Sequence, residues 1–68
     1  MLDARTKELI AIGCSVACNC HPCVEHHIST AREMEIDQDD IRQAVETGRM
    51  VRGGAAGQMD KLLAELSE

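Results

Sequence analysis

The 68-residue sequence contains two cysteines spaced for redox chemistry, Cys20 and Cys23, with His21 and Pro22 between them. Cysteines three residues apart are close enough to form a small disulfide when a helix begins there and holds them on one side. The unpaired N–H groups and the dipole at a helix start lower the pKa of a thiol and favour the thiolate. Proline suits the first helical turn and keeps that turn stiff. The pair is therefore predicted to be a reactive dithiol rather than two inert buried residues.

His27 and Glu8 are the residues best placed to handle the thiol proton. His27 lies four residues after Cys23, so on a helix both share one face. An imidazole there can accept and return a proton. Glu8, judged by itself, has the character of a solvated carboxylate, but it lies at the edge of the buried face of its predicted helix. From there it can turn inward and orient His27, which gives a carboxylate, imidazole and thiol series.

For four other polar residues the sequence supports only weaker predictions. His21 precedes proline, so it is predicted to be extended and to border the pocket. His26 is rotated by about 100° from His27 on a helix and is predicted to face solvent or a subunit contact. Arg49 and Arg52 are expected to be exposed, at most at a pocket entrance, without a specific role.

Cys14 and Cys18 complete the set of four cysteines, and they are predicted to be small buried apolar residues. The alternative is a tetrahedral zinc site formed by Cys18, Cys20, Cys23 and His27, with an iron–sulfur centre as a weaker variant. The short spacing between Cys18 and Cys20 and the proline in the dithiol favour the redox interpretation, and a bound metal would quench the nucleophile. Under that interpretation no cofactor is expected.

The apolar residues recur at helical spacing and predict an all-α fold without strands. The first helix is expected from Asp3 to about Cys18, and the second from Pro22 to about Met34. Asp37 is predicted to cap a third helix that the glycine pair at 53–54 ends or kinks. A final amphipathic helix is expected over 55–66, with an apolar stripe that belongs to the core or to a subunit interface.

Size and charge limit the classes of protein that the chain can belong to. Residues 1–68 make a single domain, and without Phe, Tyr or Trp its core is too thin to stand alone, so a homo-oligomer is expected. A net charge of −5 with scattered basic residues excludes a nucleic-acid partner.

No apolar run approaches the ~20 residues of a membrane span, and no targeting signal is evident. The expected location is the cytoplasm, where clustered cysteines are more often catalytic or metal-binding than structural.

With these residues in view, the chain resembles the alkylhydroperoxidase D-like branch of the carboxymuconolactone decarboxylase family. The motif consists of Glu8, eleven residues, Cys20, two residues, Cys23, three residues and His27. Residues 8–13 and 55–61 are also similar to small members of that group. The fixed gap to Glu8 makes the motif fairly specific, because a generic dithiol does not require it.

The resemblance implies an all-helical oligomer, commonly a trimer or hexamer, that reduces hydroperoxides or passes electrons to a peroxiredoxin. It implies that Cys23 attacks the peroxide, that Cys20 then forms a disulfide with it, and that His27 and Glu8 relay the proton. The expected function is thus a hydroperoxide or disulfide reductase in antioxidant defence, with a thiol electron donor. The remaining alternatives are a decarboxylase and a family scaffold without peroxidase activity. Decarboxylating members do not depend on a dithiol, so the dithiol in this chain counts against the decarboxylase.

Overall fold

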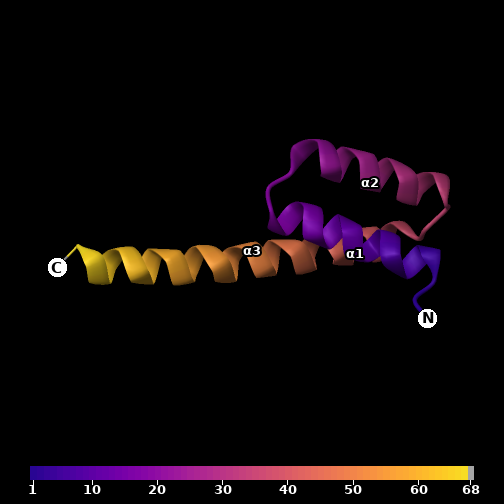
Figure 1. Ribbon diagram of the computed structural model, residues 1–68. Helices are drawn as coiled ribbons and strands as arrows, with labels where there is room; N and C mark the ends of the chain where they lie inside the picture. The colour runs from indigo at the N-terminus through magenta and orange to yellow at the C-terminus, as the bar shows by residue number, and fades with distance from the viewer. Residues whose placement is uncertain (68) are drawn as a thin grey trace.

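The computed structural model describes residues 1–67, and in them the chain forms three helices and no strand. The helices are α1 (Ala4–Ala17), α2 (His21–Glu33) and α3 (Gln38–Leu66). Helices α1 and α2 lie side by side as a hairpin, and the first half of α3 packs along α1 (Figure 1). The predicted all-α class is confirmed.

Short links with defined backbone conformations join the helices. Asp3 caps α1 by accepting a hydrogen bond from the Thr6 N–H at 2.7 Å. Asn19 adopts the left-handed conformation (φ 56°), which asparagine tolerates better than most residues, and reverses the chain between α1 and α2. Asp37 caps α3 as predicted, accepting from the Asp39 N–H at 2.8 Å. Each helix therefore begins close to where its sequence signals place it.

Helix α3 continues through the glycine pair at 53–54, so the predicted break and the separate final helix are wrong. A glycine in a helix interior costs about 1 kcal/mol relative to alanine, which weakens a helix without forcing it to end. The pair is followed by good helix formers and by no proline. Neither glycine has a neighbouring atom within 4 Å of where a β-carbon would lie, so no packing contact bends the helix there.

The core is small and aliphatic. Its buried members come from all three helices and from the link before α3: Ile12, Ala31, Ile36 and Ile41. Partly buried side chains surround them, among them Leu9, Ile28, Ala44 and Val45. Ile12 is completely buried and is the largest side chain in this state. The apolar residues that recur at helical spacing along α1, α2 and the first half of α3 thus form the faces that pack together.

Helices α1 and α3 cross at two glycines, Gly13 and Gly48. A β-carbon added at Gly48 would lie 2.8 Å from Cβ of Val16 and closer still to the Gly13 carbonyl oxygen. Only glycine allows this approach, and Gly48 is buried by it. The crossing fixes how α3 is seated on α1.

Beyond the contact between Arg52 and Asn19, α3 extends away from the other helices (Figure 1), and we call residues 53–66 the overhang. The molecule is consequently elongated, with extents of 51 × 24 × 21 Å. The overhang exposes four large apolar side chains: Met59, Leu62, Leu63 and Leu66. They are not core residues of the single chain, and their place in a subunit interface stays a prediction. Within residues 1–67 no helix is both long and apolar enough to cross a bilayer.

Candidate functional site

Cys20 and Cys23 are joined by a disulfide at the start of α2. Cys20 is the N-cap residue of the helix and Cys23 lies in its first turn, with 5.2 Å between their α-carbons. The Cys20 N–H donates to the Ser15 carbonyl at 3.0 Å, which ties the disulfide to α1. Both cysteines are half-buried. The predicted pairing and its position at a helix start are confirmed.

The helix start around the disulfide carries little negative charge. The Cys20 side chain makes no capping hydrogen bond, and the first turn of α2 contains no acidic residue. The first-turn N–H groups and the helix dipole therefore face the sulfurs without a competing carboxylate. A helix start of this kind is the environment in which thiols generally favour the thiolate form.

Glu8 and His27 contact each other between α1 and α2. Oε1 of Glu8 lies 2.6 Å from Nδ1 of His27, with the side chains 16% and 30% exposed. An ionised carboxylate only accepts hydrogen bonds, so Nδ1 carries the proton and donates it to this bond. The other ring nitrogen, Nε2, is then the one available to exchange a proton. The predicted inward turn of Glu8 toward His27 is thus confirmed.

His27 follows Cys23 by four residues within α2, so the two residues share a face one turn apart. In the disulfide state no hydrogen bond joins the imidazole to either sulfur within residues 1–67. The structure accordingly places the Glu8–His27 pair next to the disulfide along one helix face. Its role in proton transfer stays a prediction.

The predictions for the other two histidines, His21 and His26, differ in how closely they match the structure. His21 is the first residue of α2 and is helical, so the predicted extended conformation is wrong. The restriction that a following proline imposes is a preference, and here Pro22 occupies the first turn, where it needs no hydrogen-bond partner. His21 nevertheless lines a cavity, as expected. His26 is exposed, as predicted, with its ring edge-on to His27 at 5.0 Å.

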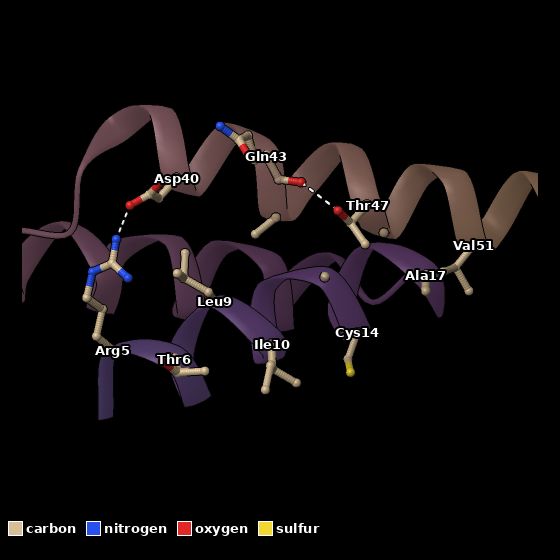
Figure 2. Close-up of a pocket in the computed structure, with 13 residues that line it drawn as sticks. Arg5, Thr6, Leu9, Ile10, Cys14, Ala17, Asp40, Gln43, Thr47 and Val51 are labelled. Atoms are coloured by element: carbon tan, nitrogen blue, oxygen red, sulfur yellow. Dashed lines mark hydrogen bonds and ion pairs between the residues drawn. The ribbon is translucent and has the colours of Figure 1, made fainter. Parts of the chain in front are cut away.

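Cys14 and Cys18 are free and exposed in this chain, which corrects the prediction that they are buried. Cys14 lies on α1 at the edge of an apolar groove between α1 and α3 (Figure 2). Cys18 lies at the end of α1, where its thiol contacts the Ser15 carbonyl at 3.6 Å. The helical spacing correctly predicted that both residues belong to the first helix. It did not show that α2 and α3 pack against other parts of the α1 surface.

The alternative metal site is not assembled. Within the described chain no group of three or more His, Cys, Asp or Glu side chains is arranged to hold a metal ion. Of the four proposed ligands, Cys18, Cys20, Cys23 and His27, two are bonded to each other in the disulfide. In this oxidised form the set therefore does not offer four ligands.

A cavity of about 400 Å³ opens beside the start of α2, between it and α3. The residues on either side of Cys20, Asn19 and His21, line it, together with Arg49 and Arg52 of α3. The sequence placed these arginines at most at a pocket entrance and gave them no role. Their position depends on the contact between α3 and the α1–α2 link, where Arg52 donates to Asn19 Oδ1 at 3.2 Å. The sequence does not show this contact.

The fold and the site together define a small all-helical protein with a cysteine pair at a helix start and a carboxylate–imidazole pair beside it. The chain belongs to the carboxymuconolactone decarboxylase family, whose family model matches residues 1–64. It is 37% identical over 68 residues to a protein of Paracoccus denitrificans described as uncharacterized protein 4 in cox locus. That alignment covers 98% of this chain and 61% of the relative. No solved structure matches the chain.

Proposed function

We propose that the protein is a dithiol oxidoreductase that reduces hydroperoxides or disulfides. The observation that carries this proposal is the Cys20–Cys23 disulfide at the start of α2, one turn before an imidazole that a carboxylate orients. Family membership supports it. Since the chain spans 61% of the relative's length, activity is proposed for this chain and not transferred from that protein.

For a hydroperoxide the proposed reaction has two steps. The Cys23 thiolate attacks the O–O bond, so an S–O bond forms, the O–O bond breaks and the leaving oxygen takes a proton to become an alcohol. Cys20 then attacks the sulfenic acid sulfur, so the S–S bond forms and water leaves. Both electrons come from the dithiol, which an external thiol donor must return to the reduced state. The choice of Cys23 as the attacking thiol follows the family resemblance.

His27 and Glu8 supply the proton path in this proposal. Nε2 of His27 takes the proton of the attacking thiol and returns it to the leaving oxygen, while Glu8 holds Nδ1 and stabilises the imidazolium. With a disulfide substrate the same groups act on sulfur. Cys23 forms a mixed disulfide and releases one thiol, and Cys20 resolves it and releases the second. A cytoplasmic location suits either reaction, because thiol donors are abundant there.

We also propose that the chain associates with copies of itself. The overhang carries an apolar stripe without a partner in the chain, and its Met59, Leu62, Leu63 and Leu66 are spaced on one face. A second apolar surface lies in the groove between α1 and α3, where Figure 2 shows Leu9 directed toward α3. The overhang of one copy is the occupant proposed for this groove in another. Equilibrium sedimentation tests this: Leu62→Gln with Leu63→Gln should shift the protein to monomer, and a wild-type monomer at all concentrations contradicts it.

Cysteine variants test the dithiol. Reduced protein given one equivalent of cumene hydroperoxide should lose two of its four thiols, and peptide mapping should find them linked as Cys20–Cys23. Cys20→Ser and Cys23→Ser should each abolish turnover with dithiothreitol as donor, whereas the control Cys14→Ala should retain it. Equal loss in all three, or metal in protein purified without added metal, favours the cluster interpretation instead.

Glu8→Gln tests the proton path because it keeps the shape of the side chain and removes its charge. We expect kcat/KM to fall about tenfold or more, as for other groups that orient a catalytic imidazole. The thiols of this variant should still pair on slow oxidation. Glu65→Gln, in the overhang, is the matched control and should leave kcat/KM unchanged. Equal activity of Glu8→Gln and wild type would remove Glu8 from the mechanism.

A further inference from the structure

The cavity beside the start of α2 has the size and position of a substrate site for the neighbouring disulfide. Its volume of about 400 Å³ lies within the range of small-molecule pockets. Two of its lining residues, Asn19 and His21, are the residues directly before and after Cys20 in the chain. Three valines, Val16, Val24 and Val45, give it apolar surface for an organic body. The cysteines themselves are not among its lining residues, but chain neighbours of both are: Asn19 and His21 flank Cys20, and Val24 follows Cys23.

The polar groups of the cavity are unusual for so acidic a protein. Two arginines line it, although the chain carries a net charge of −5. Glu25 is the one carboxylate among the lining residues of the described chain. The positive end of the α2 dipole, free of acidic residues in its first turn, lies at the same place. The lining side chains thus carry two positive charges and one negative charge, whereas the molecule as a whole is acidic.

Arg52 differs from other arginines of the chain in its hydrogen-bond partner. Arg5, Arg42 and Arg49 each pair with a carboxylate, on Asp40, Asp39 and Glu46. Arg52 instead donates to the neutral amide oxygen of Asn19 at 3.2 Å. This bond holds the guanidinium at the cavity wall without neutralising it, so its charge is available to a ligand. Arg49, 3.1 Å from Glu46 and 59% exposed, is the second and weaker donor.

We propose that this cavity binds the anionic group of the substrate, so that the protein prefers hydroperoxides or disulfides that carry a carboxylate or a similar anion. The inference rests on the proposed function, because it names the substrate class of that dithiol. Arg52 and Arg49 are specificity residues in this account: they hold the anion while the valines contact the organic body. A planar guanidinium matches a carboxylate with two parallel hydrogen bonds.

Matched substrates test the preference. Cumene hydroperoxide and its para-carboxylate differ by one anionic group, and kcat/KM should be about tenfold higher for the carboxylate, the value expected for one charge-assisted hydrogen bond. The preference should weaken in about 0.5 M salt. For the disulfide reaction, dithiodipropionate and its dimethyl ester form the equivalent pair.

Arginine variants locate the preference. Arg52→Gln with Arg49→Gln should bring the ratio of the two kcat/KM values close to one, mainly by raising the KM of the carboxylate substrate. Arg52→Lys should restore part of the preference, since it keeps the charge. Arg42→Gln is the control for Arg49→Gln, because it also removes an exposed i,i+3 ion pair of α3 but lies outside the cavity. Equal turnover of both substrates by the wild type, or a preference that survives the double variant, overturns the inference and leaves the proposed function standing.

A binding measurement keeps the inference separate from the proposed function. The disulfide form should bind 4-isopropylbenzoate, with NMR shift changes at Asn19 and at the Arg52 guanidinium, and should not bind the corresponding benzamide. This requires no turnover, so it decides the inference even if neither hydroperoxide is reduced. Failure of turnover with intact binding counts against the proposed function alone, and absence of binding counts against the cavity.

Discussion

The two halves of α3 differ in what holds them in helical form. The first half, from Gln38 to the crossing at Gly48, packs against α1 and supplies Ile41 to the core. The overhang has the same helical geometry but no buried residue. Isolated helices of this length are marginal in water, and most helical stability in proteins comes from packing of an apolar face. The comparison shows that packing within the chain stabilises the first half of α3, whereas the overhang gains no such packing from the chain.

The largest effect is expected from truncation in the packed region. Ile12→Ala should lower the free energy of unfolding by about 3 kcal/mol, because Ile12 is completely buried and the small core cannot close the gap. Leu63→Ala, in the exposed stripe, should cost less than about 0.5 kcal/mol at concentrations where the protein is monomeric. Urea denaturation measures both. Equal losses would mean that the overhang folds back onto the chain.

A smaller loss is expected at the crossing itself. Gly48→Ala should destabilise by about 2 kcal/mol although alanine favours helices, because its methyl group meets Val16 and the Gly13 carbonyl and pushes α1 and α3 apart. Thermal unfolding measures the change. Stabilisation by this variant would show that the helices are not seated as closely as described.

The opposite sign is expected a short distance along the same helix. Gly54→Ala should stabilise by about 0.5–1 kcal/mol, because the added methyl group meets no atom within 4 Å and alanine favours the helix. Circular dichroism should also show increased helicity. If the helicity instead falls, the chain does bend at this glycine pair in solution.

The smallest effect is expected at the other end of the packed region and depends on pH. The hydrogen bond from Thr6 lowers the pKa of the Asp3 carboxyl below its model-peptide value of 3.8. A carboxyl with a lowered pKa in the folded state stabilises the fold above its unfolded pKa, and this contribution is lost as the pH falls through the folded pKa. Asp3→Asn keeps a capping oxygen but does not titrate, so it should lose less stability on acidification than wild type. Urea denaturation at neutral pH and below pH 3.8 makes the comparison, and identical acid sensitivity of both proteins would contradict it.

The local features of the fold could be predicted from the sequence, and those that depend on packing between helices could not. Caps, apolar stripes and the Cys20–Cys23 spacing are written within a few residues, so α1, α2 and the start of α3 were placed correctly. The prediction of a helix end at the glycine pair 53–54 was wrong because glycine occurs both at helix ends and inside weakened helices. Without a capping residue or a proline nearby, the sequence does not distinguish the two cases. The exposure of Cys14 and the position of Arg49 and Arg52 at a cavity depend on where α3 lies on α1, and no local pattern encodes that. The Glu8–His27 contact was predicted because Glu8 lies at the edge of the buried face of its helix and because the family resemblance pairs it with His27.

The hydrogen bond between Glu8 and His27 also has a mechanical consequence. It attaches the helix that carries the cysteines to α1, and another face of α1 forms the wall of the apolar groove. Helix α1 therefore carries both features, with the carboxylate that contacts His27 on one face and the lining of the groove on another.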